Sequence, residues 1–304
     1  MKIAICMVCK NVGKYLRCVF ENIKKLMKYN IILIIEYDNC NDNTYEIIKK
    51  YIIELKIEHK IINLRGNNSI YRTERISNAR NACLEYLDTL EDIDYHIVLD
   101  PDDINSKPWN INLIYSVLDS EKKWDAVSFN GDNSKDTDGN YFDKWALLID
   151  DFKWHCWGYG DFSPLIAKEM EKYIFEKFEK NEIVECHSAF NGFAIYNTKV
   201  FKGLRYCGRI SKIDSNFFKK KIISKSIEFL KKRPFLLEIK HKYSKVPEVH
   251  FPLNSDKNQC YMFKEENNIQ KILPDEICEH IYYHLCAKSR GASILISKNN
   301  ICIN

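Results

Sequence analysis

Three carboxylates stand together in Asp100-Pro101-Asp102-Asp103, directly after the apolar run 95–99. A short apolar run that ends at a turn predicts a buried strand, so these carboxylates should lie at its C-terminal end, where open α/β sheets bind ligands. Carboxylates this close repel one another unless a cation lies between them. Oxygen ligands suit Mg²⁺ or Mn²⁺, which usually also hold substrate phosphates. The tetrapeptide predicts a divalent metal that grips a diphosphate. Asp-x-Asp alone is more typical of an acidic turn that ends a strand, and the rest of the chain favours the metal.

Two other polar segments could also contact a ligand. Asp38 lies in the polar segment 36–44, and its carboxylate could accept hydrogen bonds from a nucleotide base or ribose. Arg75 and Arg80 could offer forked, permanently charged donors to a diphosphate. Each segment also has a simpler interpretation, since small polar residues form turns and arginines are common on surfaces.

The apolar pattern of the first half alternates between strands and helices. We expect strands at 2–8, 31–35, 61–64, 95–99 and 124–129. We expect helices over 16–27, 45–55 and 76–90, and another after Pro108. Asn43 with Glu46 predicts a capping pair at the second helix. This alternation predicts an α/β fold with a mostly parallel central sheet flanked by helices.

The second half is less regular. Helices are expected at 164–179 and 275–287, and strands at 193–196 and 293–296. The stretch 219–245 carries ten Lys or Arg residues against two Glu residues. It could make a peripheral contact with an anionic surface, or it is an exposed insertion with a solvated basic face.

Composition limits the partners and the location. The chain has 304 residues, 45% of them hydrophobic, which allows one large domain or two small ones. A net charge of +4 is too small to predict nucleic-acid binding. The chain contains no apolar stretch of about 20 residues, so we expect no transmembrane helix. The N-terminus lacks signal-peptide features. The twelve cysteines are scattered, so Cys6 and Cys9 are interpreted as buried reduced thiols of a cytoplasmic protein.

Taken in order, these segments resemble a known family. Lys10-Asn11, Asp38, Arg75 with Arg80, and the acidic tetrapeptide resemble GT-A fold nucleotide-sugar glycosyltransferases. Three later segments resemble fungal capsule-associated mannosyltransferases and their relatives in large DNA viruses. These are Tyr141-Phe142-Asp143-Lys144-Trp145-Ala146-Leu147, Ser188-Ala189-Phe190-Asn191-Gly192-Phe193-Ala194-Ile195-Tyr196, where Asn191 replaces a family glycine, and Cys278-Glu279-His280-Ile281 with His284.

The resemblance covers about 2–300 and implies one GT-A domain, with 219–245 as the main departure. Residues 1–130 would form the nucleotide-sugar-binding half and 131–304 the acceptor-binding half. A viral source would place the enzyme in the host cytoplasm. The implied reaction moves a sugar from a UDP- or GDP-linked donor, with Mn²⁺ or Mg²⁺, to a hydroxyl of a glycan or glycoprotein.

The resemblance also implies a role for each matching residue. Asp102 would be the main metal ligand, Asp103 would assist it or orient the donor sugar, and His280 would bind the metal or the diphosphate. Glu279 would be the catalytic base, with Asp143 as the alternative. Because adjacent helical residues are about 100° apart, Glu279 and His280 should not point the same way. Trp145 would stack on a sugar or simply pack in the core. The remaining donor-binding residues would be Lys10, Asn11, Asp38, Arg75, Arg80, Asp100, Asn191 and Gly192.

Three rival functions use some of the same residues. His280-x-x-x-His284 has zinc spacing, but the carboxylate precedes the first His instead of following it. Asp100-x-Asp102 could belong to a phosphatase, but the later acidic element expected near Gly160-Asp161 is incomplete. A non-catalytic sugar- or nucleotide-binding relative would not need the full set of carboxylates, arginines and Glu279.

Overall fold

The computed structural model describes residues 1–121, 124–131, 143–149, 163–209, 249–250, 261–266, 269–273 and 276–303. The basic stretch 219–245, Tyr141-Phe142 and Gly160-Asp161 lie outside these residues. Within the described residues, no helix is long and apolar enough to cross a membrane.

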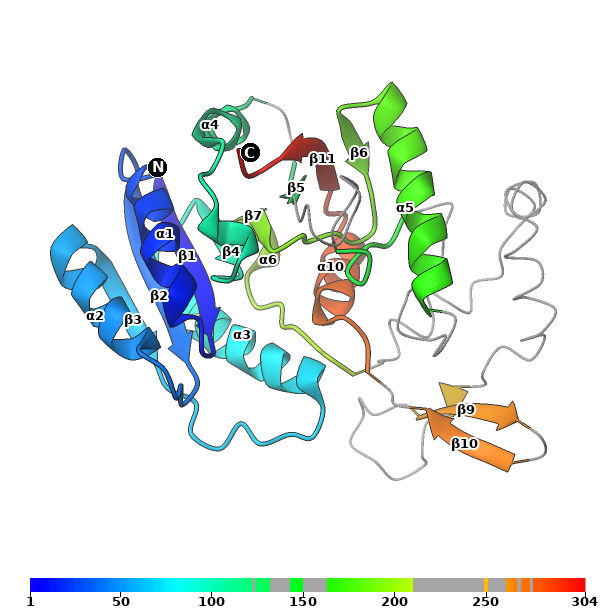
Figure 1. Cartoon of the computed structure of the whole chain (residues 1–304). Coiled ribbons are helices and arrows are strands. Elements are labelled where there is room, and N and C mark those ends of the chain that lie inside the picture. The colour runs from blue at the N-terminus through cyan, green and yellow to red at the C-terminus, as the bar shows by residue number, and fades with distance from the viewer. Residues whose placement is uncertain are drawn as a thin grey trace.

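A central eight-stranded sheet has the order β3-β2-β1-β4-β7-β5-β11-β6 (Figure 1). Its strands are β1 (Lys2–Cys9), β2 (Asn30–Tyr37), β3 (Glu58–Ile62), β4 (Tyr95–Leu99), β5 (Ala126–Asn130), β6 (Ile183–Glu185), β7 (Phe193–Asn197) and β11 (Ile294–Asn300). The pairs β1/β2, β1/β4, β2/β3 and β5/β11 are parallel. Strand β7 runs antiparallel to β4 and β5, and β6 runs antiparallel to β11. The predicted α/β fold with a mostly parallel sheet is confirmed.

The period-2 alternation of β1 divides the core between two faces. Ile3, Ile5 and Met7 are buried with α1 (Gly13–Lys24) and α2 (Thr44–Leu55) on one face. Ala4 and Cys6 are buried on the other face with α3 (Arg72–Asp88). Figure 1 shows α1 and α2 together on one side of the blue strands and α3 on the other. Both faces are therefore covered, as a parallel sheet requires.

The remaining elements complete these two layers. They are η1 (Ile104–Ser106), α4 (Ile111–Leu118), α5 (Ser163–Lys180), α6 (Thr198–Phe201) and α10 (Glu279–Ser289). Strands β8 (Val249–His250), β9 (Tyr261–Glu266) and β10 (Ile269–Leu273) form a separate three-stranded antiparallel sheet. That small sheet and β6 were not expected from the sequence, because their apolar runs are short.

Two local predictions about the chain can be compared directly with the structure. The Asn43–Glu46 capping pair is wrong, because Asn43 makes no side-chain cap bond. Instead Asp42 accepts hydrogen bonds from the backbone N–H groups of Gly13 (2.9 Å) and Thr44 (3.1 Å). The interpretation of Cys6 and Cys9 as buried free thiols is confirmed.

Candidate functional site

The sequence-predicted donor residues follow neighbouring parallel strands. Lys10 and Asn11 follow β1, Asp38 follows β2 and Asp100 follows β4, and β1 lies between β2 and β4. The C-terminal ends of parallel neighbours meet at one edge of a sheet, so the fold brings these residues to the same edge. This is the edge where the sequence predicted a ligand.

Lys10 and Asn11 are tied directly to the turn that contains Asp38. Lys10 Nζ lies 3.3 Å from Asp38 Oδ2 and donates to the Asp38 carbonyl at 2.8 Å. Asn11 Oδ1 accepts from the backbone N–H of Asn41 at 2.8 Å. Arg75 lies apart from this group in the first turns of α3, where its guanidinium donates to the carbonyl of Ser69.

The acidic turn meets a second turn because β4 and β7 are antiparallel. Leu99 pairs with Phe193, so Asp100 and Gly192 face each other across the ends of the two strands. The backbone N–H of Asp100 donates to the carbonyl of Gly192 at 2.8 Å. Gly192 has φ +77°, a conformation that favours glycine. Gly192 therefore lies beside the acidic turn, and its donor-binding role stays a prediction.

Asn191 connects this second turn to the segment of Asp143. It is fully buried with φ +57°. Its Oδ1 accepts from the backbone N–H of Asp143 at 2.6 Å, and its Nδ2 donates to the carbonyl of Phe129 at 3.0 Å. Asparagine tolerates the left-handed region better than most residues, and its amide supplies bonds that glycine could not.

Asn105 is a positioning residue of this site that sequence reasoning missed. Its Nδ2 donates to the carbonyls of Asp100 and Gly192, each at 2.8 Å, and its side chain is fully buried. Asn22 on α1 donates in turn to the carbonyls of Asn105 (3.1 Å) and Lys107 (2.7 Å). The one sequence feature that pointed to this network was Asn22, a polar residue on the apolar face of α1.

Asp102 and Asp103 differ in exposure. Asp103 is exposed, whereas Asp102 is partly covered and its Oδ1 accepts from the backbone N–H of Ile104 at 3.2 Å. Burial, helped by the charges of Asp100 and Asp103, raises the pKa of Asp102 to about 7. A divalent cation would relieve this crowding, so these carboxylates fit the predicted metal. Within the described residues no group of three or more His, Cys, Asp or Glu forms a ready-made metal site. A cluster of three is not required for Mg²⁺, because substrate phosphates and waters complete its coordination and one or two carboxylates are enough.

Arg80 brings the acidic turn and α10 together. Its Nη2 lies 2.8 Å from Asp100 Oδ1, and its Nε lies 3.1 Å from Glu279 Oε1. Arg80 and Glu279 are both only 5% exposed.

The charge of Glu279 acts on Asp143, the other candidate base. Burial, with the charges of Glu279 and Asp100 adding to it, raises the pKa of Asp143 to about 6. Burial likewise raises the pKa of Glu279, and the charge of Arg80 opposes that rise.

The two histidines of α10 lie in the core. His280 is 1% exposed, and its ring stacks on Phe190 with centroids 3.7 Å apart. Burial lowers the pKa of His280 well below its usual value, so the ring is neutral. His284 Nδ1 bonds with Ser188 Oγ at 3.0 Å and its Nε2 with Tyr196 Oη at 3.1 Å. With both nitrogens of His284 engaged, the structure does not favour zinc on this pair. The metal or diphosphate role of His280 stays a prediction.

Glu279 and His280 were expected to point in different directions, because adjacent helical residues are about 100° apart. The structure corrects this, since Glu279 Oε1 lies 3.7 Å from His280 Nε2. Two long side chains at the start of α10 can bend toward each other.

Trp145 is 39% exposed. Its sugar-stacking role also stays a prediction.

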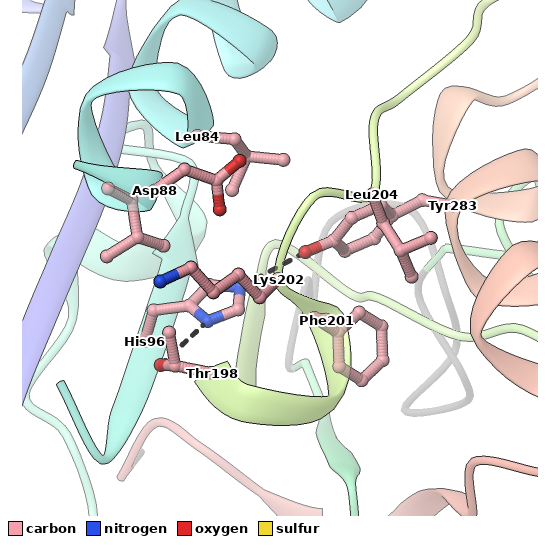
Figure 2. Close-up of a pocket in the computed structure, with 9 residues that line it drawn as sticks. Leu84, Asp88, His96, Thr198, Phe201, Lys202, Leu204 and Tyr283 are labelled. Carbon is pink, nitrogen blue, oxygen red and sulfur yellow. Dashed lines mark hydrogen bonds between the residues drawn. The ribbon is translucent and has the colours of Figure 1, made fainter. Parts of the chain in front are cut away.

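A small pocket lies at the opposite end of β4 from the acidic turn (Figure 2). His96, four residues before Asp100, contributes its ring to this pocket. Its Nδ1 bonds with Thr198 Oγ1 and its Nε2 with Tyr283 Oη, both at 3.2 Å. Both ring nitrogens are engaged, and burial lowers the pKa of His96 to about 3. This histidine is a satisfied core residue, so the pocket is not a competing catalytic site.

Comparisons with known proteins identify the family of the chain. No curated protein matches the chain significantly. Among solved structures, a TarS fragment from S. aureus has a TM-score of 0.42 and 14% identity over 72% of this chain and 54% of its own. A mannosyltransferase from Pyrobaculum calidifontis, solved with GDP-Man and Mn²⁺, has a TM-score of 0.36 and 11% identity over 67% and 47%.

Glucosyl-3-phosphoglycerate synthase from Mycobacterium tuberculosis, solved with Mn²⁺, UDP and glucosyl-3-phosphoglycerate, has a TM-score of 0.35 and 13% identity over 67% and 59%. This chain thus spans about half the length of these solved structures. The narrower resemblance to fungal capsule enzymes and viral relatives stays a prediction. A model of the family described as "Glycosyl transferase family 2" matches residues 4–205, well over half of the chain, and the chain therefore belongs to this glycosyltransferase family.

Proposed function

We propose that this chain is a metal-dependent glycosyltransferase that moves a sugar from a nucleotide-diphosphate sugar to a hydroxyl of a glycan or glycoprotein. The observation that carries the proposal is the convergence of an acidic turn, a buried arginine and a buried glutamate at one edge of the sheet. Asp100, Arg80 and Glu279 meet there through contacts of 2.8 and 3.1 Å. A cytoplasmic location, in a host cell if the source is viral, belongs to the proposal and rests on the sequence alone.

The donor-side residues have distinct tasks in this proposal. The donor is a UDP- or GDP-linked sugar. Lys10, Asn11 and Asp38 contact its base or ribose, and Asp100 contacts the ribose. Arg75 offers its forked cation to the diphosphate. Mn²⁺ or Mg²⁺ on Asp102, assisted by Asp103, would neutralise charge on the leaving diphosphate.

On the acceptor side, one proton has to be removed from the acceptor hydroxyl. As the acceptor oxygen bonds to the anomeric carbon, the bond from that carbon to the diphosphate oxygen breaks. Glu279 takes the hydroxyl proton in a direct displacement, with Asp143 as the alternative base. Asn191 and Gly192 shape the wall between the two sides, because they join the acidic turn to the Asp143 segment.

An assay of nucleotide-diphosphate release tests the proposal. UDP- and GDP-sugars are presented with hydroxyl acceptors in Mn²⁺ or Mg²⁺, and then in excess chelator. We expect release only with metal, and a loss of more than about 10²-fold for Asp102→Asn. Asp119→Asn is the matched control, because it removes an exposed carboxylate that pairs with Lys28 away from the site.

Three results would contradict the proposal in different ways. Full activity in chelator, or in Asp102→Asn, would exclude the metal role. Binding of the nucleotide sugar without turnover for any acceptor would favour a non-catalytic binding protein. Release of free sugar in place of a glycosylated acceptor would favour a hydrolase.

A further inference from the structure

We infer that Arg80 is a positioning residue, whose single guanidinium holds the candidate base Glu279 against Asp100 of the acidic turn. Its two partners lie 20 and 199 residues away in the sequence. The inference rests on the proposed function, because it assigns Arg80 a role in aligning the base with the donor side. It differs from the sequence-based expectation that Arg80 binds the donor diphosphate.

Two of the three guanidinium nitrogens of Arg80 bond to protein carboxylates. Nη2 bonds to Asp100 and Nε bonds to Glu279. The third nitrogen, Nη1, is buried and has no hydrogen-bond partner among the described residues. The cation is enclosed by aromatic rings, 4.8 Å from the centroid of Phe190 and 5.7 Å from that of Tyr206. The side chain is only 5% exposed, so a donor phosphate has little access to this cation.

The charges explain why one arginine has to serve both carboxylates. Glu279 is 5% exposed, and the side chain of Asp100 is 34% exposed. Without a cation between them, the two carboxylates would repel each other in a site with little water to screen them. A guanidinium can donate to both at fixed angles, whereas the lysine ammonium is a point charge on a flexible stem.

The contact also links two parts of the chain. Glu279 is the first residue of α10, and Asp100 directly follows β4. Arg80, on α3, connects the start of α10 to the acidic turn. A base that is displaced by about 1 Å can slow a reaction about 10²-fold, so this contact should affect the chemical step more than donor binding.

Arg80→Lys is the first test, because it keeps the charge and removes the fork. We expect its kcat for transfer to fall about 10²-fold. The KM of the donor, and the calorimetric Kd of UDP or GDP with Mn²⁺, should stay within about threefold of wild type. Arg205→Lys is the matched control and should change neither, because Arg205 pairs with Asp88 at 2.7 Å near the other end of α3.

The second test needs no turnover. The melting temperatures of Arg80→Lys, Glu279→Gln and the double variant should be non-additive, with the double variant losing less than the sum of the two single losses. Additive losses would refute the coupling. A loss of nucleotide affinity equal to the loss of kcat would make Arg80 a donor ligand, and an unchanged kcat would exclude positioning. If wild type transfers no sugar, the proposed function fails, whereas the melting cycle still decides whether Arg80 couples to Glu279.

Discussion

Glu36 is a buried carboxyl whose charged form is poorly compensated. It lies near the end of β2 and is fully buried, and within the described part of the chain neither carboxylate oxygen has a hydrogen-bond partner. Burial, with the charge of Asp38 adding to it, raises the pKa of Glu36 from 4.5 to about 7. The charged form is therefore disfavoured in the native state, and this predicts a stability that depends on pH.

The sign follows from proton binding. The native state holds the proton of Glu36 more tightly than the unfolded state, so stability falls as pH rises between the two pKa values. The cost is absent below the unfolded pKa of 4.5, grows up to about 7 and is complete above that. At 1.36 kcal/mol per pKa unit, the shift from 4.5 to about 7 corresponds to a ceiling of about 3 kcal/mol.

Glu36→Gln keeps the shape and removes the titration. Near pH 4 the variant and wild type should have similar free energies of unfolding, and near pH 8 the variant should be more stable by up to about 3 kcal/mol. Urea unfolding at several pH values measures this difference. Glu54→Gln is the control, because Glu54 is an exposed glutamate of the adjacent helix α2. A difference between Glu36→Gln and wild type that does not change with pH would refute the reasoning.

Two further predictions concern the proposed site. Glu279→Gln should lower kcat by about 10²–10⁴-fold with nearly unchanged donor affinity, measured by initial rates and calorimetry. If its rate is within a few fold of wild type, the base is not Glu279, and Asp143→Asn should then show that loss. Arg75→Ala should weaken nucleotide binding by about 1.5–3 kcal/mol, and Arg75→Lys should restore little of it. Unchanged affinity in a calorimetric titration would make Arg75 a surface residue.

The sequence predicted the sheet edge that carries Asp38 and Asp100 well because its determinants are local. The apolar run before Asp100 became β4 with the predicted bounds, 95–99. A polar turn after a buried strand needs no knowledge of distant residues, because strand burial and turn chemistry are both encoded within a few positions. The parallel arrangement then followed from the alternation of strands and helices, and it placed Asp38 and Asp100 at one edge.

The contacts across the site could not be predicted, because they join residues far apart in the sequence. The antiparallel pairing of β4 with β7 places Gly192 beside Asp100, and apolar patterns do not encode strand partners. Asn105 is a similar case, since a polar residue after an acidic turn is typical of a loop. Only the fold shows that it is fully buried and bonded to two carbonyls.

The family match and the candidate base lie in different parts of the chain. The family model ends at residue 205, whereas Glu279 begins α10 beyond it. Arg80 lies within the matched region and contacts Glu279 at 3.1 Å. The position of the proposed base therefore depends on a contact that the matched region makes with a segment outside it. Substitutions that disturb this contact should change turnover before they change donor binding, and this distinguishes alignment of the base from recognition of the nucleotide.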